Sequence, residues 1–326
     1  MCGIVGYSGP KEPLPILING LSRLEYRGYD SAGIAISDGS KITIEKKEGK
    51  LNVLKDHLKN NPVSGNLGIG HTRWATHGVP NDVNAHPHSD NGGEFAIIHN
   101  GIIENYAEIK KDLLEEGFEF KSDTDTEVVA VELSRKWNGE LLKTVVDVAK
   151  TLDGTYALVV TTTKEEGTIV AGRLMSPLVL GVGDNEVFLA SDSAAILEHT
   201  KKMIFLENGD FVEIKNGQYK LFDSDLNEIE REIQEIDWEV SEAEKAGYDH
   251  FMYKEILEQP EVIERTISGR LETTSEEIPI KLDQASKYEK IWIVACGTAY
   301  HAGLFGKDLF EKVLGVPVSV ELASEF

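Results

Sequence analysis

A cysteine directly after the initiator methionine is the first residue of the sequence that could carry chemistry. Removal of Met1 would leave Cys2 with both a thiol and a free α-amino group. A thiol ordinarily has a pKa near ~8.5 and an α-amine one near ~7.7–8.0, so this amine can accept the thiol proton close to neutral pH. Cys2 is therefore a candidate nucleophile with its own base. The alternative is a small apolar residue at the start of a strand.

A second candidate segment reads HTRWATHG at residues 71–78 and is predicted to form a loop after a strand at 67–71. Arg73 in this loop could bind a carboxylate through a bidentate, charge-assisted pair. It could equally bridge to one of the many acidic residues of the chain. Trp74, Thr76 and His77 share the segment and could help to enclose a ligand.

Residues 95–103 read FAIIHNGII, and an Asn-Gly pair between two apolar runs is first of all a signal for a tight hairpin. The same pair could serve catalysis. The Asn100 side chain offers an NH₂ group and Gly101 offers a backbone N–H, and such donors stabilise an oxyanion. Both interpretations remain open on the sequence, because the glycine also frees the amide to face a ligand.

The segment SDTDTE at residues 122–127 precedes a run of helical period. Thr124 and Glu127 have the spacing of a capping box, which predicts a helix that begins here. Asp125 then lies in the first helical turn, where its carboxylate could bind a cation such as a substrate α-ammonium. A general acid and base pair formed with Asp123 is a weaker hypothesis, because the two residues point in different directions.

Five of the nine histidines lie between residues 71 and 99, at positions 71, 77, 86, 88 and 99. Imidazole is a common metal ligand, and His86-Pro87-His88 could suggest a metal site. No helical H-x-x-x-H spacing supports it, and a proline separates the two histidines. We therefore expect no metal, and we expect these histidines to be loop residues that support the site.

The elements that must position these residues read as α+β, because helices and strands do not alternate one for one. Successive strands in hairpin-like pairs favour antiparallel sheets with helices on the outside. Predicted strands lie near 3–8, 32–37, 41–47, 67–71, 94–99, 155–163, 167–172, 178–182, 186–191 and 210–215. Predicted helices lie near 13–24, 51–59, 104–116, 125–136 and 141–152.

The composition favours an enzyme that acts on small molecules. The 326 residues are 41% hydrophobic and 27% charged, as in an average globular protein. No apolar run approaches the ~18 residues of a spanning helix, and no secretory signal is visible. The two cysteines are too few for a disulfide framework, which fits the cytoplasm. A net charge of −23 repels nucleic acid and anionic membranes, so we expect neither as a partner.

The character of the chain changes at residue 223. Ten acidic residues between 223 and 244 are accompanied only by Arg231 and Lys245, which is typical of a solvated connector. We therefore expect a first domain at 1–222, an acidic linker at 223–249 and a second domain at 250–326. The second begins with a helix near 250–270, which Pro260 should kink or restart. Residues 290–326 then suffice for one βαβ unit, so we expect the chain to stop inside this domain.

Six segments make the combination specific. CGIVGY, LEYRGYDSAGIA, HTRWATHG, NAHPH, HNGIIENY and SDTDTEV occur in this order, and KEILEQP and ACGTAYHAG follow downstream. Over essentially its whole length, the chain resembles the glutamine–fructose-6-phosphate aminotransferase family. This resemblance implies a four-layer α-β-β-α N-terminal-nucleophile hydrolase fold. After the linker it implies the first βαβ of a doubly wound α/β sugar isomerase domain.

The resemblance also implies roles for the candidate residues. Cys2 would attack the side-chain amide of glutamine, with Asn100 and Gly101 as the oxyanion hole. Arg73 would hold the α-carboxylate of glutamine and Asp125 its α-ammonium. The loop that closes over glutamine would contain Trp74, Thr76 and His77.

In the second domain, Thr298 and Ala299 would lie at the sugar phosphate, although the family usually has serine at the position of Ala299. Ammonia would pass to fructose 6-phosphate in the full-length protein, which we expect to be a homodimer without a cofactor. The present chain alone should only hydrolyse glutamine. Cys296 is expected to be a buried strand residue. A non-catalytic phosphosugar sensor and a metal-dependent hydrolase remain the alternatives.

Overall fold

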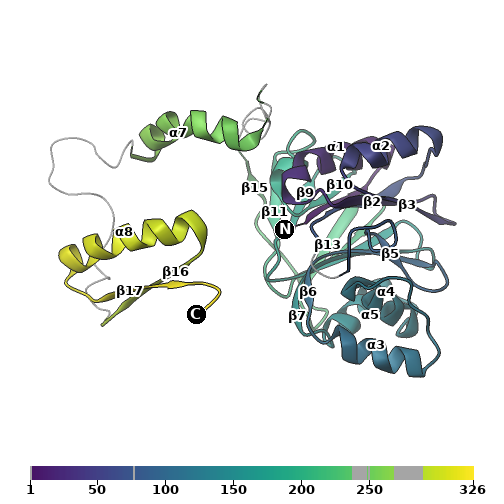
Figure 1. The fold of residues 1–326 in the computed structure, drawn as a ribbon. Coiled ribbons are helices and arrows are strands. Elements are labelled where there is room, and N and C mark those ends of the chain that lie inside the picture. Colours follow the sequence, from purple (N-terminus) through teal and green to yellow (C-terminus); the bar gives the residue numbers. More distant parts are fainter. Residues whose placement is uncertain (1, 76–77, 237–247, 249, 268–288) are drawn as a thin grey trace. The chain divides into compact units, whose positions relative to one another are not determined.

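The computed structural model describes residues 2–75, 78–236, 248, 250–267 and 289–326 (Figure 1). The chain divides into two compact units, Met1–Phe251 and Met252–Phe326, called here the first and the second unit. Within the described ranges, no helix is both long enough and apolar enough to cross a membrane.

The first unit is built on two sheets whose paired strands run antiparallel, as predicted. In both sheets the strands follow one another in the spatial order below. The eight-stranded sheet A contains β15 (Gln234–Glu235), β11 (Lys202–Phe205), β9 (Val179–Val182), β10 (Val187–Ala190), β1 (Gly3–Ser8), β4 (Leu67–Arg73), β2 (Ser31–Ser37) and β3 (Ile42–Glu48). The seven-stranded sheet B contains β14 (Glu228–Ile229), β13 (Gln218–Phe222), β12 (Phe211–Lys215), β8 (Thr168–Leu174), β7 (Gly154–Thr162), β6 (Phe95–Ile103) and β5 (His88–Ser89).

Helices cover the outer face of each sheet, so that the unit has four layers, α-β-β-α (Figure 1). One apolar core lies between the sheets, and a further core lies between each sheet and its helices. This arrangement confirms the predicted fold class. The helices on sheet A are α1 (Pro13–Leu24) and α2 (Leu51–Asn60), and those on sheet B are α3 (Tyr106–Glu115), α4 (Asp125–Arg135) and α5 (Leu141–Ala149).

Strand alternation decides which side chains face the space between the sheets. Ile4 of β1 lies in the core between the sheets, whereas Val5 packs against the helices. Because successive side chains of a strand point to opposite faces, Cys2 shares the face of Ile4. By the same rule, His71 and Arg73 share the face of Ile69 on β4, and Asn100 shares that of Ile98 on β6. The two sheets therefore bring these four polar residues to one end of the inner layer.

Two predicted loops are strands in the structure. The Asn-Gly pair does not turn, so the expected hairpin at Asn100 and Gly101 is wrong, since β6 runs through both residues and pairs with β7 along its length. Likewise, β4 continues through Arg73, so the loop begins only at Trp74. Both strands extend because each has paired neighbours, which a local sequence pattern does not record.

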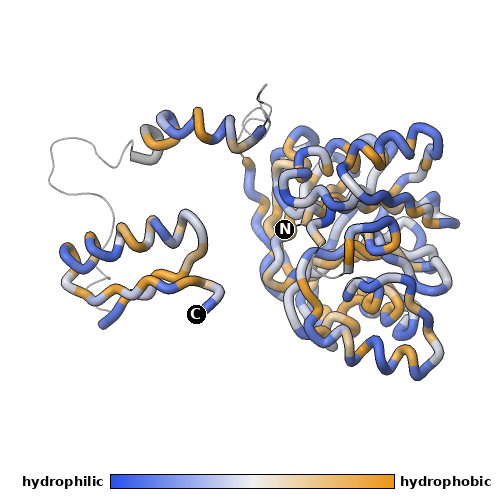
Figure 2. The backbone as a smooth tube through the Cα atoms, viewed as in Figure 1, coloured by the Kyte–Doolittle hydropathy of each residue, from blue (hydrophilic) through white to orange (hydrophobic). Residues whose placement is uncertain are grey.

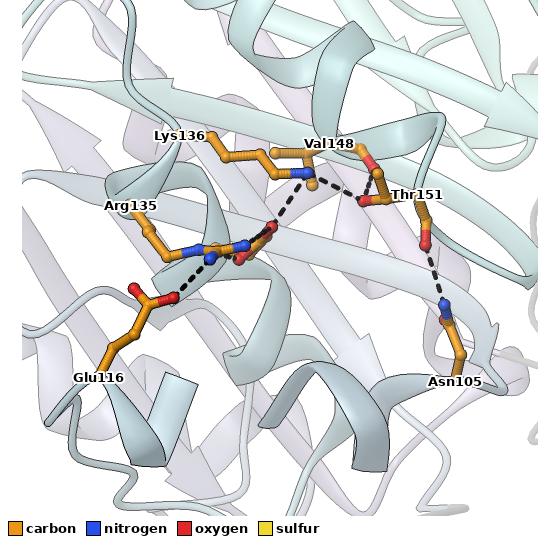
Figure 3. Close-up of polar contacts among 7 residues, drawn as sticks. Asn105, Glu116, Arg135, Lys136, Val148 and Thr151 are labelled. Atoms are coloured by element: carbon orange, nitrogen blue, oxygen red, sulfur yellow. Dashed lines mark hydrogen bonds and ion pairs between the residues drawn. The ribbon is translucent and has the colours of Figure 1, made fainter. Parts of the chain in front are cut away.

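Contacts beside sheet B connect the ends of three helices (Figure 3). Arg135 at the end of α4 donates to Glu116 after α3 at 2.7 Å. Lys136 donates to the Thr151 hydroxyl after α5 at 3.4 Å, and Asn105 donates to the Thr151 carbonyl at 2.9 Å. Because Asn105 immediately precedes α3, these contacts fix both ends of the segment that follows β6.

Residues 223–236, where the sequence predicts a solvated connector, add two short strands to the first unit. β14 pairs with β13, and β15 pairs with β11. Arg231 between them donates to both carboxylate oxygens of the buried Asp210, at 2.9 and 2.8 Å. The acidic run therefore has an anchored half, while residues 237–247 and 249 lie outside the described residues.

The second unit contains α7 (Phe251–Ile267), β16 (Ile291–Ala295), α8 (Gly297–Leu314) and β17 (Val318–Leu322). β16 and β17 pair in parallel around α8, as a βαβ unit requires. Of the two predicted effects of Pro260, a kink or a restart, the restart is wrong, because α7 continues through this residue. Pro260 is exposed, and the carbonyl that it leaves without an N–H partner can accept from water. Figure 2 shows hydrophobic residues along the strands of both units.

Candidate active site

Cys2 lies immediately before β1 and is partly buried. The backbone N–H of Trp74 donates to the Cys2 sulfur at 3.2 Å, and the thiol faces the Trp74 carbonyl at 3.6 Å. Burial raises the pKa of the Cys2 thiol, while the Trp74 amide and the charge of Arg73 act in the opposite direction. A thiol with a raised pKa is mostly protonated at neutral pH, so its activation requires a base.

Asn100 approaches Cys2 from the other sheet. Its side-chain Nδ2 donates to the backbone carbonyl of Cys2 at 3.0 Å. The next residue, Gly101, has φ of +133°, and a Cβ there would lie 2.0 Å from the carbonyl oxygen of Thr155 on β7. Only glycine fits this backbone without displacing β7. The structure thus brings Asn100 directly to Cys2, and it places Gly101 next along the same strand.

Arg73 ends β4 and is 3% exposed. Its Nη2 donates to the Gly78 carbonyl at 3.4 Å. Burial lowers the pKa of the guanidinium, and the charges of Cys2, Asp125 and Asp30 oppose that shift. Arg73 is therefore a buried cation within electrostatic reach of the Cys2 thiol and of two carboxylates.

Asp125 is the first residue of α4 and is 6% exposed. One carboxylate oxygen accepts from the backbone N–H of Ile103 at 2.9 Å, and the other faces the Thr126 hydroxyl at 3.3 Å. These contacts join the start of α4 to the end of β6. An ionised carboxylate has about four acceptor positions, so a cation could still be bound.

The start of α4 confirms half of the predicted capping box. The Thr124 side chain accepts from the backbone N–H of Glu127 at 3.3 Å. The Glu127 carboxylate does not accept a hydrogen bond from the backbone amide of Thr124, as a complete capping box requires. It accepts instead from the backbone amides of Lys121 and Ser122, at 2.9 and 2.6 Å. The carboxylate thereby fixes the turn that leads into the helix.

The loop after β4 is held by Asp30, a residue to which no sequence motif gave a role. Asp30 accepts from the backbone N–H of Ala75 at 2.8 Å, and its own amide donates to the Arg73 carbonyl at 3.0 Å. The Trp74 ring is 45% exposed and meets the Tyr29 ring edge-on, with centroids 5.6 Å apart. Asp30 and Tyr29 belong to the LEYRGYDSAGIA segment, and this motif is the sequence signal that could have identified them. Thr76 and His77 lie outside the described residues.

Four of the five clustered histidines are buried beside the site, and His77 is the one outside the described residues. His71 and His86 stack with ring centroids 4.3 Å apart, and His88 meets His86 edge-on at 4.7 Å. Burial lowers the pKa of all four, that of His71 to about 3. His71, His88 and His99 lie in strands, so the expectation that all are loop residues is wrong. Among the residues described, no three His, Cys, Asp or Glu side chains are placed to hold a metal ion.

The candidate residues of the second unit are exposed. Thr298 and Ala299 lie in the first turn of α8. Cys296 is the N-cap residue of that helix and is exposed, so the expected burial is wrong. The strand ends one residue earlier, at Ala295, which places Cys296 in the turn.

Comparisons with known proteins agree on one kind of domain. A family model described as a glutamine amidotransferase domain matches residues 56–250. The glutamine–fructose-6-phosphate aminotransferase [isomerizing] of Clostridium perfringens is 48% identical over 330 residues, covering 100% of this chain and 54% of the relative. The protein of that name from Fusobacterium nucleatum is 49% identical over 333 residues, with the same coverage. The chain thus spans about half the length of the curated relatives it matches.

Two solved structures share the fold. The structure of the allosteric regulatory enzyme of purine biosynthesis aligns with a TM-score of 0.61 and 29% identity, over 69% of this chain and 50% of that one. The glutamine phosphoribosylpyrophosphate amidotransferase from B. subtilis, complexed with ADP and GMP, aligns with a TM-score of 0.62 and 22% identity. That alignment covers 98% of this chain and 65% of the other.

Proposed function

The chain belongs to the glutamine amidotransferase family, and from that premise we propose that its first unit hydrolyses the side-chain amide of glutamine with Cys2 as the nucleophile. The observation that carries the proposal is the meeting of three groups at one end of the inner layer. The backbone amide of Trp74 donates to the sulfur of Cys2, and the side chain of Asn100 donates to the backbone carbonyl of Cys2. The positive charge of Arg73 lowers the pKa of the Cys2 thiol, against the effect of burial.

The chemistry begins with removal of Met1, which frees the α-amine of Cys2. This amine takes the thiol proton, and the sulfur attacks the side-chain amide carbon of glutamine. The Asn100 NH₂ and the Gly101 N–H stabilise the oxyanion that forms, a contribution worth about 2.7–4 kcal/mol for one donor in a known hydrolase. The α-amine returns the proton to the leaving nitrogen, which departs as ammonia. Water then hydrolyses the thioester to glutamate and restores the thiol.

Substrate recognition uses the buried charges beside the nucleophile. We assign the α-carboxylate of glutamine to Arg73, because a guanidinium binds a carboxylate with two parallel hydrogen bonds. The α-ammonium is assigned to Asp125. Trp74, Thr76 and His77 belong to the loop that we propose closes over the bound amino acid.

For the whole protein we propose transfer of the ammonia to fructose 6-phosphate, giving glucosamine 6-phosphate. The names of the relatives and their identity over the full length of this chain support this assignment. We propose a glutaminase domain at 1–222, a linker at 223–249 and the start of a sugar isomerase domain at 250–326. Thr298 and Ala299 would lie at the sugar phosphate, and the whole protein would be a homodimer. No cofactor takes part.

The test uses purified chain in two measurements. Intact mass should show loss of Met1, and an electrophilic glutamine analogue should then add to Cys2 and leave Cys296 unlabelled. Incubation with glutamine and fructose 6-phosphate should give glutamate without glucosamine 6-phosphate. Labelling of Cys296, or full turnover with Met1 retained, would overturn the assignment of the nucleophile. Appreciable glucosamine 6-phosphate would overturn the restriction to hydrolysis, and loss of activity on chelation would favour a metal-dependent hydrolase.

A further inference from the structure

We propose that His71 is a positioning residue that holds the side-chain amide of Asn100 with its NH₂ group turned toward the nucleophile. The inference deepens the proposed function, since it rests on Asn100 as an oxyanion donor. His71 would not touch the substrate and would act only through Asn100.

The two residues meet across the inner layer from opposite sheets. His71 lies on β4 opposite Ile4 of β1, and its side chain is 0% exposed. Its Nε2 lies 3.0 Å from the Asn100 Oδ1 and 3.0 Å from the carbonyl oxygen of His99. One ring nitrogen therefore contacts two oxygen atoms of sheet B.

The contacts of Asn100 fix the orientation of its amide. A backbone carbonyl can only accept, so the atom that faces the Cys2 carbonyl at 3.0 Å must be the Nδ2 donor. The Oδ1 then faces His71. Both oxygen atoms at the His71 Nε2 are acceptors, and this nitrogen must carry the proton. The Nδ1 atom of His71 then carries no proton, only a lone pair. This agrees with its having no hydrogen-bond partner among the described residues.

The surroundings restrict rotation of the His71 ring. The ring of His86 stacks on it at 4.3 Å and 28°. Gly33 lies opposite His71 in the β2–β4 pairing, and a Cβ there would lie 2.2 Å from the carbonyl oxygen of His86. Glycine at this position leaves room for the segment that carries His86. The ring of His71 is thus clamped between that segment and its strand neighbours.

Removal of this donor would leave the Asn100 amide without a fixed orientation. If the amide turned over, its Oδ1 would face the Cys2 carbonyl, and two acceptors would oppose each other. The NH₂ group would then point away from the position of the oxyanion. A neutral donor also suits a fully buried site, and burial lowers the pKa of His71 to about 3, so the ring stays neutral under assay conditions.

The experiment compares His71→Leu, His71→Gln and Asn100→Ala in the full chain with Met1 removed, measuring glutamate release at varied glutamine concentration. Leucine removes the donor at similar volume, while glutamine can return an N–H toward Asn100. We expect His71→Leu to lower kcat by about 10- to 100-fold with KM changed by less than about 3-fold, since it misplaces an oxyanion donor without removing substrate contacts. We expect His71→Gln to recover most of this loss.

The double variant separates positioning from general damage. If His71 acts through Asn100, then His71→Leu in the Asn100→Ala background should change kcat by less than about 3-fold. The proposal would be overturned if the kcat losses of His71→Leu and Asn100→Ala multiplied in the double variant. It would also be overturned if His71→Leu changed only KM. The matched control is His88→Leu, a buried histidine that contacts the Thr124 hydroxyl at 3.0 Å. It should lower thermal stability to a similar extent and keep kcat within about 3-fold.

One measurement requires no variant. Long-range proton–nitrogen NMR spectra of the wild-type protein should show His71 protonated at Nε2 and bare at Nδ1. A proton on Nδ1 would overturn the proposal even if His71→Leu does not fold. Absence of glutamine turnover in the wild type with Met1 removed would instead contradict the proposed function. The tautomer of His71 would then still show whether its Nε2 donates to Asn100.

Discussion

The two units differ in how much of their apolar surface is buried. In the first unit, both faces of each sheet are covered, and side chains such as Ile4, Ile69 and Ile98 are fully buried. In the second unit, β16 and α8 leave large apolar side chains open, among them Trp292 at 50% and Phe305 at 81% exposure. An enclosed layer between two sheets can hold charged and polar groups in fixed positions. A two-stranded sheet with one covering helix offers no such interior.

The two cysteines show what this difference means for reactivity. Each lies at a strand end beside a glycine, Cys2 before β1 and Cys296 after β16. The sulfur of Cys2 is held by the Trp74 amide and influenced by the charge of Arg73. Cys296 is exposed at the start of α8. The proposed nucleophile, Cys2, therefore differs from Cys296 in its surroundings rather than in its residue type.

The largest expected effect is a direct test of this contrast. Cys2→Ala should lower glutamine hydrolysis by about 10⁴-fold or more, because removing a covalent nucleophile leaves only the contribution of binding and oxyanion stabilisation. Cys296→Ala should leave the rate within about 2-fold of the wild type. Both are measured as glutamate release. A comparable loss of glutamate release in the two variants would show that the two cysteines do not differ in their contribution to hydrolysis.

Acid should destabilise the first unit strongly. Its four buried histidines have lowered pKa values, whereas the unfolded chain binds protons below about pH 6.5. Their stabilisation is therefore present above that pH and is lost as the pH falls. His71, whose pKa is lowered to about 3, should cost about 1 kcal/mol between pH 7 and 5.5, and the other three histidines should add to this loss.

Urea unfolding at the two pH values measures this loss. The His88→Leu variant should lose less stability than the wild type over the same interval, because it lacks one of the histidines whose pKa is lowered by burial. Equal pH dependence in the two proteins would mean that His88 is not held neutral in the folded state.

Hydrogen exchange should separate the units by about 100-fold or more. The slowest amides of β1, β4, β6 and β7 should exchange at least that much more slowly than the slowest amides of β16 and β17, since fewer buried contacts resist opening in the second unit. The measurement is peptide-resolved exchange on the intact chain. Equal protection would show that the second unit is as stable as the first.

The smallest effect concerns the boundary of the first unit. Arg231→Ala should cost about 1–2 kcal/mol of unfolding free energy, because it leaves the buried carboxylate of Asp210 without two hydrogen bonds. The exposed Glu230→Ala serves as the control, with a change within about 0.5 kcal/mol. An unchanged Arg231→Ala variant would mean that this part of the chain does not stabilise the unit.

Much of the fold was predictable, because hydrophobic periodicity records which face of each element is buried. The helix Pro13–Leu24 and the strand Gly3–Ser8 were predicted with their observed bounds. Where neighbours rather than local pattern decide, the prediction was wrong. Asn100 and Gly101 form part of a strand because β7 pairs with them, and β4 extends beyond the predicted strand to Arg73 because β1 and β2 flank it.

The candidate site was predictable as a set of residues but not as a geometry. The motifs named Cys2, Arg73 and Asn100, and the structure brings them together. They gave no role to Asp30, which holds the Trp74 loop, or to the contact between His71 and Asn100. Such contacts join residues far apart in sequence, so no local spacing encodes them.

The position of β1 within sheet A has a consequence for biosynthesis. This strand, which is made before the other strands of the sheet, lies between β4 and β10, and the backbone N–H of Ile4 donates to the hydroxyl of Ser191. Translation must therefore pass Ser191 before β1 has both neighbours, and pairings so distant along the chain form slowly. The segment that contains the candidate residue Cys2 is therefore made before its neighbours in the sheet and becomes enclosed only after most of the first unit has been synthesised.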